Sequence, residues 1–133
     1  TADSGTGRPI YISQIDIRMM QQSKAAIFAA IELLVDKASI SASAVERFLL
    51  TGAFGSDLNI NDAIKIGLFP RFQNARIEQI LGGASSGADM ILLNPELRDA
   101  ASDIARNTNY VDLMDNSEFE FRFSKAQLFP GSQ

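Results

Sequence analysis

The chain of 133 residues contains no cysteine and no histidine. These absences exclude a thiolate nucleophile, a Ser-His dyad, an imidazole zinc ligand and a cysteine-ligated iron–sulfur cluster within this chain. Any redox chemistry of a larger protein that contains it must take place elsewhere. The lack of cysteine also fits a reducing compartment, so a cytoplasmic location is expected.

Long apolar runs are absent too, since no stretch approaches the roughly 20 consecutive apolar residues that span a bilayer. The N-terminus, Thr1 to Gly5, lacks the basic and apolar segments of an export signal. Acidic residues outnumber basic residues by 16 to 12, and the basic residues are scattered singly along the chain. The sequence therefore predicts neither a membrane nor a nucleic acid as a partner.

Hydrophobic residues make up 46% of the chain, which is enough for one core. Residues 1–9, rich in Gly, Ser and Thr, are predicted to be a flexible lead-in, and residues 131–133 a tail. Residues 10–130 then form a single domain.

The first half of this domain alternates between predicted helices and strands. Ser13 as N-cap, with Asp16 three positions later, begins a helix that continues to about Ala38. Residues 45–51 have the length and apolar content of a buried strand that ends at Gly52. A short helix, capped by Asn59 or Asn61 and ended by Gly67, follows.

The second half repeats this alternation. Its predicted elements are a strand at Ile77–Leu81, a small-residue turn at Gly82–Gly87, a helix from Ala88, a helix from Asn94-Pro95 to about Asn107, a third strand at Tyr110–Met114, and a tail, Ser117–Leu128, for which helix is favoured over strand. Ile10–Ile12 fits a short edge strand. The pattern predicts an α/β fold in which the strands near 45–51 and 77–81 are neighbours in one sheet.

Lys24 lies in the middle of the apolar face of the long predicted helix. At 100° per residue, five apolar side chains fall within about 40° of it, namely Ile17, Met20, Phe28, Ile31 and Val35. A buried ammonium is costly without a partner, so Lys24 either extends its head to water or meets an anion or polar ligand. The sequence leaves both readings open.

Two glycine-rich turns follow the predicted strands. Gly52-Ala53-Phe54-Gly55 stands past the carboxyl end of the first strand, the edge where ligands collect in open α/β sheets. A glycine pair is also common in ordinary loops. Gly82–Gly87 leads into a helix whose N-terminus could receive an anion, but it lacks the Lys-Ser/Thr pair of a P-loop.

The carboxylates show no spacing typical of a metal or acid–base site. Asp57, Asp62 and Asp89 are near the glycine turns, and we interpret them as solvated or capping residues. Neither a metal ligand nor a catalytic residue is predicted in this chain.

Four segments in order carry a family resemblance: Ile12-Ser13-Gln14-Ile15-Asp16-Ile17-Arg18, Gln22-Ser23-Lys24-Ala25-Ala26-Ile27, Leu50-Thr51-Gly52-Ala53-Phe54-Gly55, and Ala63-Ile64-Lys65-Ile66-Gly67-Leu68-Phe69-Pro70. With them the chain resembles, from about Ile10 to Pro130, the C-terminal part of the reductive activators of corrinoid proteins. The block from Leu50 to Pro70 is the most specific.

This resemblance implies the C-terminal subdomain of an actin-like, sugar-kinase type (ASKHA) ATP-binding fold, a mixed sheet flanked by helices. Gly52, Ala53, Phe54 and Gly55 resemble the adenosine motif of that superfamily, and Lys24 stands where the helix faces the nucleoside. ATP or ADP would be the ligand, with magnesium in the intact domain. The chain departs from the family pattern at Gly82-Gly83, where Gly-Asn is expected, and at Ser86, where a smaller residue is usual.

The implied function is the adenosine side of an ATP-dependent activator. In such a parent, ATP binding or hydrolysis changes contacts with the corrinoid protein, so that an electron from an upstream iron–sulfur domain reduces inactive Co(II) to Co(I) in an anaerobic O-demethylase or methyltransferase system. The superfamily's phosphate-binding hairpins and magnesium-handling Asp are expected upstream, in the missing N-terminal part of the ATPase domain. The isolated chain is therefore not expected to hydrolyse ATP.

Two other classes remain open at this stage. The chain could be an interaction module, whose acidic surface and Phe-rich tail dock a partner or a second copy to make a homodimer. It could also be part of a small-molecule kinase of the same superfamily. An upstream four-cysteine ferredoxin pattern would favour the activator, and a sugar-binding Asp the kinase.

Overall fold

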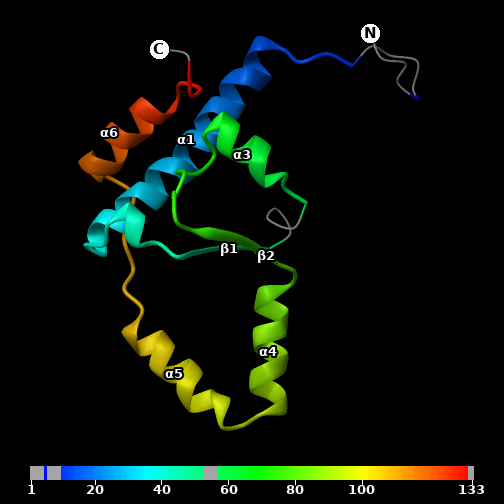
Figure 1. Ribbon diagram of the computed structural model, residues 1–133, viewed down its shortest axis with the longest axis vertical. Helices are drawn as coiled ribbons and strands as arrows, with labels where there is room; N and C mark the ends of the chain where they lie inside the picture. Colours follow the sequence, from blue (N-terminus) through cyan, green and yellow to red (C-terminus); the bar gives the residue numbers. More distant parts are fainter. Residues whose placement is uncertain (1–4, 6–9, 53–56, 132–133) are drawn as a thin grey trace.

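The computed structural model describes residue 5, residues 10–52 and residues 57–131. Its elements are α1 (Gln14–Lys37), a 3-10 turn (Ala42–Ala44), β1 (Arg47–Thr51), α3 (Ile60–Ile66), β2 (Arg76–Ile80), α4 (Gly83–Leu93), α5 (Leu97–Asn107) and α6 (Ser117–Ala126) (Figure 1). The predicted α/β class is confirmed.

The long helix α1 begins with the predicted capping box. The Ser13 hydroxyl accepts the Asp16 N–H at 3.2 Å, and the Asp16 carboxylate accepts the Ser13 N–H at 2.8 Å. These bonds satisfy backbone donors that have no partner inside the helix. The deeply buried apolar positions of α1 are Ala25, Ala29 and Leu33. Near the start of α1, the predicted apolar face is exposed to solvent. Met20, for example, is 51% exposed.

The strands β1 and β2 form a two-stranded parallel sheet, as predicted, with Phe48 opposite Ile77 and Leu50 opposite Gln79. These four residues share one face, because strand side chains alternate. On that face lies the core of Ala63, Leu68 and Phe69, with Phe48, Leu50 and Ile77 packed against it. The Phe48 ring is 5.2 Å from that of Phe69, centroid to centroid.

Helix α3 is fixed at both ends by residues that the sequence singled out. The Asn59 side chain accepts the Asp62 N–H at 3.1 Å. Gly67 ends the helix in the left-handed region, at φ 73°, which glycine adopts without strain. Asn59, of the two candidates, is thus the N-cap.

The sequence interpretation was wrong in four places. Gly82–Gly87 is not a turn, because Gly82 at φ 59° starts α4 and its carbonyl accepts the Ser86 N–H at 2.8 Å. Tyr110–Met114 forms no strand, nor does Ile10–Ile12; both segments are largely exposed, and no described strand lies beside them to supply hydrogen bonds. Helix α5 starts at Leu97 rather than at Asn94-Pro95.

The C-terminal tail is helical, as the favoured interpretation held. The Asn116 side chain accepts the N–H groups of Glu118 and Phe119, and the rings of Phe119 and Phe123 stack one turn apart at 6.1 Å. Helix α6 lies beside α1, whereas α4 and α5 extend away on the opposite side of the strands (Figure 1). None of the helices in the described ranges is both long and apolar enough to cross a membrane.

Candidate functional site

The carboxyl ends of β1 and β2 lie side by side, and each leads into a glycine in the left-handed region. We call Thr51, Gly52, Gly82 and Gly83 the carboxyl edge. Gly52 has φ 89° and Gly82 has φ 59°. A β-carbon on Gly52 would meet no atom of the described residues within 4 Å, which leaves the backbone open to a ligand on the side that they form.

Thr51 and Gly83 join the two strand ends of the carboxyl edge. The Gly83 N–H donates to the Thr51 hydroxyl oxygen at 3.2 Å. A β-carbon on Gly83 would lie 2.5 Å from that oxygen, closer than any real contact. The departure from the expected Gly-Asn at Gly82-Gly83 therefore has a physical reason, because Thr51 occupies the space that a side chain at position 83 needs.

Helix α4 starts at this edge without a side-chain cap. The first N–H groups of a helix have no partner inside it, and together with the helix dipole they attract an anion. Nearby, the Gln79 side chain on β2 donates to the Leu58 carbonyl at 2.9 Å and fixes the segment that follows the first turn. Ala53, Phe54 and Gly55, the rest of the predicted adenosine motif, lie outside the described residues.

Lys24, the other predicted site residue, is buried, with 2% of its surface exposed. Its ammonium donates to the carbonyl oxygens of Ala126 and Leu128, at 2.5 and 2.6 Å, and lies 5.3 Å from the centroid of the Phe129 ring. Burial lowers the pKa of Lys24 below its ordinary value. The reading in which the ammonium extends to water does not hold. Two of its three N–H donors thus bind one carbonyl at the last residue of α6 and one in the segment that follows it.

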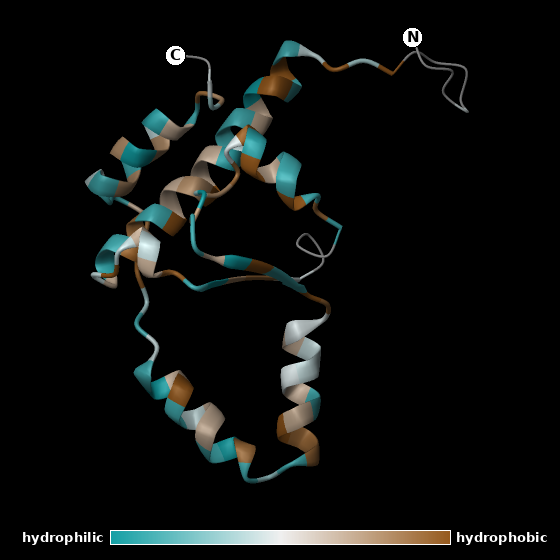
Figure 2. Ribbon diagram, in the orientation of Figure 1, coloured by the Kyte–Doolittle hydropathy of each residue, from teal (hydrophilic) through white to brown (hydrophobic). Residues whose placement is uncertain are grey.

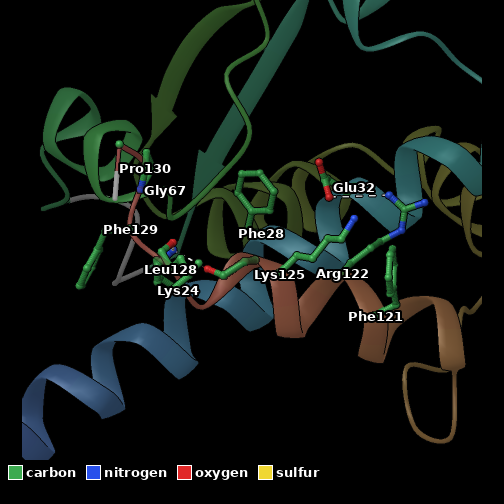
Figure 3. Close-up of a pocket in the computed structure, with 12 residues that line it drawn as sticks. Lys24, Phe28, Glu32, Gly67, Phe121, Arg122, Lys125, Leu128, Phe129 and Pro130 are labelled. Carbon is green, nitrogen blue, oxygen red and sulfur yellow. Dashed lines mark hydrogen bonds and ion pairs between the residues drawn. The ribbon is translucent and has the colours of Figure 1, made fainter. Parts of the chain in front are cut away.

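A pocket of about 760 Å³ lies between α1 and α6 and has Lys24 in its wall. We call it the α1–α6 pocket. Figure 3 shows its lining residues, which are Lys24, Phe28, Glu32, Gly67, Phe121, Arg122, Lys125, Ala126, Leu128, Phe129, Pro130 and Gly131. Of the residues that the structure describes, none of the carboxyl edge is among them. The structure thus does not bring Lys24 and Gly52 into one pocket.

Opposite charges line the α1–α6 pocket. Arg122 on α6 pairs with Glu32 at 3.7 Å and with Asp36, both on α1. The Lys125 ammonium lies 4.3 Å from the centroid of the Phe121 ring. The sequence analysis missed these residues, although Lys24, Phe28, Glu32 and Asp36 recur at every fourth position and so form one row along α1.

The carboxylates of Asp57, Asp62 and Asp89, which the sequence analysis singled out, do not form a metal site with one another. Asp62 pairs with Lys65 at 3.0 Å in the first turns of α3, and Asp57 and Asp89 are exposed. In the ranges 10–52 and 57–131, no group of three or more Asp and Glu side chains could hold an ion.

Comparison with known proteins identifies the family. The family model described as the C-terminal domain of RACo, the ASKHA domain, matches residues 1–133. The corrinoid activation enzyme RamQ of Eubacterium limosum is 34% identical over 123 residues, which cover 92% of this chain and 21% of RamQ. A solved structure of a reductive activator for a corrinoid, iron–sulfur protein superposes with a TM-score of 0.81 at 32% identity, over 96% of this chain and 20% of that one. The chain spans about a fifth of the length of these relatives. It therefore belongs to the family of C-terminal ASKHA domains of the reductive activators of corrinoid proteins.

Proposed function

We propose that this chain is the adenosine-side ATP-binding subdomain of an ATP-dependent reductive activator, which helps to reduce inactive Co(II) corrinoid proteins to Co(I). The parent would act in the cytoplasm, carry its iron–sulfur cluster outside this chain and dock a corrinoid protein. Family membership supports this role, since RamQ and the matched structure are named for corrinoid activation.

The observation that carries the proposal is the carboxyl edge. Two neighbouring parallel strands end in left-handed glycines there, and the uncapped start of α4 adjoins them. Backbone that is open beside Gly52 can approach a flat base or ribose closely, and the α4 N-terminus favours the negative charge of a phosphate. Gly52, Ala53, Phe54 and Gly55 are the residues we assign to the adenosine.

The chemistry of the reaction belongs to groups outside this chain. The corrinoid and the iron–sulfur cluster would supply the electron transfer, and ATP would supply the coupling free energy. Magnesium would enter with the nucleotide in the intact domain. The role of this chain would be to bind and orient the nucleoside. It would also change its contacts with the rest of the protein when ATP is replaced by ADP.

Lys24 has two candidate roles in nucleotide binding, direct contact and positioning, and they predict different effects of its substitution. In direct contact, its third N–H would donate to the ribose or the adenine, which ATP and ADP share. In a positioning role, Lys24 holds the segment after α6, whose Pro130 packs against Gly67 at the end of α3. A β-carbon on Gly67 would lie 3.0 Å from Pro130 Cγ and 3.4 Å from Lys24 Nζ, so the three groups are in close contact. Because α3 follows residues 52–55 in the sequence, this contact would act on the adenosine motif indirectly.

A glycine substitution at the carboxyl edge tests the proposal. In the full-length protein, we expect Gly52→Ala to weaken ATP and ADP binding alike. A side chain at positive φ costs about 1–2 kcal/mol, so the free backbone should leave the conformation that admits the nucleoside, and restoring it on binding would raise Kd roughly five- to thirtyfold. Calorimetric titration with each nucleotide measures this. Gly87→Ala is the matched control, because Gly87 has no positive φ and no neighbour within 4 Å of its β-carbon position. Equal affinities for the Gly52 variant and the wild type would refute the assignment.

A further inference from the structure

The α1–α6 pocket collects the lysines that have no acidic partner. The chain has four lysines, and all of them lie within the described residues. Lys37 and Lys65 each form an ion pair with a carboxylate. Lys24 and Lys125 form none with any described residue, and both line the α1–α6 pocket. A chain whose net charge is −4 thus gathers two unneutralised positive charges in the wall of one pocket.

The Lys24 ammonium is the deeper of these two charges. It donates to the neutral carbonyl oxygens of Ala126 and Leu128 and is almost completely buried. Carbonyl groups satisfy its N–H donors but do not neutralise its charge, so a positive potential remains in the pocket wall. The Lys125 side chain, which is exposed, contacts the ring of Phe121. It is therefore the cation that a ligand can reach.

Arg122 lines the pocket as well, but its charge is already neutralised. Its guanidinium pairs with Glu32 and Asp36 on α1. The Nε–H of Arg122 is nevertheless buried and has no hydrogen-bond partner in the described part of the chain. Buried donors in folded proteins nearly always have a partner. An acceptor that a ligand brings to this wall would satisfy the Nε–H.

Aromatic rings form the apolar part of the wall. Phe28 comes from α1, Phe121 from α6 and Phe129 from the segment after α6. Figure 3 shows the ring of Phe28 and the side chain of Lys125 in the wall of the same pocket. Rings beside cations suit a ligand whose flat apolar body carries an anionic group. The pocket volume of about 760 Å³ lies within the range that is usual for small-molecule sites.

We propose that the α1–α6 pocket binds a small organic anion with an aromatic group, at a site separate from the carboxyl edge. The anionic group would contact Lys125, and the buried Lys24 would act on it through its field rather than by contact. The aromatic group would lie against the phenylalanine rings. A nucleoside triphosphate suits this pocket less well, because it carries more negative charge than two lysines neutralise. In addition, the described residues form no site for the magnesium that accompanies it.

This inference does not depend on the proposed function, because none of the described residues of the carboxyl edge lines the α1–α6 pocket. The organic anion and the nucleotide should therefore bind together without competition. If excess ADP displaces the anion competitively, the pocket is part of the nucleotide site and the inference is overturned. The assignment of this chain to ATP binding would survive that result.

Two fluorescent probes of nearly the same shape test the pocket in the full-length protein without nucleotide. Anilinonaphthalene sulfonate is an aromatic monoanion, and N-phenylnaphthylamine is its uncharged counterpart. In fluorescence titrations we expect one saturable site for the anion, with an affinity at least about fivefold above that for the neutral probe. Equal affinities would overturn the proposal, because apolar surface alone would then explain the binding. The absence of saturable binding would overturn it as well.

Substitutions at position 125 show whether the anion binds in this pocket. Lys125→Met keeps the length of the side chain without its charge, and we expect about two- to fivefold weaker binding of the anionic probe. Lys125→Glu adds repulsion and should weaken it further, by about tenfold, whereas Lys125→Arg should retain the affinity. Because position 125 is exposed, the fold should tolerate all three changes.

Lys37→Met is the matched control for these variants. Lys37 also joins α1 to α6, through Glu118, but it does not line the pocket. Its loss should leave the affinity for the anionic probe unchanged. An affinity that Lys125→Glu does not alter, or that Lys37→Met lowers equally, would overturn the proposal.

Discussion

Thr51 and Gly83 illustrate how single residues determine the shape of the carboxyl edge. The Thr51 hydroxyl lies where a side chain on residue 83 would stand, so the two positions are matched. In the sequence, Gly83 is a departure from the family pattern, and nothing connects it with Thr51. Their coupling becomes visible only when the ends of the two strands are seen side by side.

This matching gives a prediction at the scale of the residue. Gly83→Asn alone should destabilise the full-length protein by about 1–3 kcal/mol, because the added side chain overpacks against Thr51. Thr51→Ala should relieve the clash, so that the double variant regains most of the loss. Thermal unfolding of the four proteins gives the coupling free energy, which we expect to exceed about 0.5 kcal/mol. Additive effects would show that the two residues do not share the space.

At the scale of the elements, the sequence was most informative where the signals are local. The capping box of α1, Asn59 and Gly67 at the ends of α3, and Gly52 after β1 were all predicted, because each acts within a few residues of itself. The strand predicted at Tyr110–Met114 was wrong because a strand exists only beside another strand, and the residues of one segment cannot supply its partner.

The surroundings of Lys24 could be predicted only in part. Its position on an apolar face correctly indicated a buried ammonium that needs polar partners. The partners themselves are backbone carbonyls at positions 126 and 128, more than a hundred residues away. Backbone carbonyls are present at every residue and leave no mark in a sequence, so no pattern could have identified these two.

Two measurements separate the two roles of Lys24: the hydrogen–deuterium exchange of α6 with the segment after it, and the affinity for nucleotides. In the full-length protein, Lys24→Met removes both donors and leaves the Ala126 and Leu128 carbonyls unsatisfied, at a cost of about 1–3 kcal/mol for each buried group. If Lys24 is a positioning residue, the amides of 117–131 should exchange faster and the ATP and ADP affinities should fall together. If it contacts the nucleoside alone, affinity falls by about one to two decades while that exchange stays the same.

Lys37→Met is the matched control for this experiment. Lys37 also joins α1 to α6, through a 3.2 Å ion pair with Glu118, but its side chain is 50% exposed. Exposed pairs contribute little, so neither exchange nor affinity should change. Unchanged exchange and unchanged affinity in Lys24→Met would exclude both roles.

At the scale of the whole molecule, the proposed function makes this chain one part of a larger catalyst. The described residues include no cluster of carboxylates that could hold a metal, and the chain has no cysteine to bind an iron–sulfur cluster. We therefore expect the isolated chain to release no phosphate from ATP at an enzymatic rate. A phosphate-release assay with magnesium checks this. Magnesium-dependent release that a point substitution in this chain abolishes would contradict it.

The central claim is that the carboxyl edge holds the adenosine of ATP. Photolabelling of the full-length protein with 8-azido-ADP, followed by mass spectrometry of its peptides, locates the base directly. We expect the label on the peptide that contains Gly52 to Gly55, and excess ADP should suppress it. Labelling confined to peptides outside this chain, or to the α1–α6 pocket, would contradict the claim.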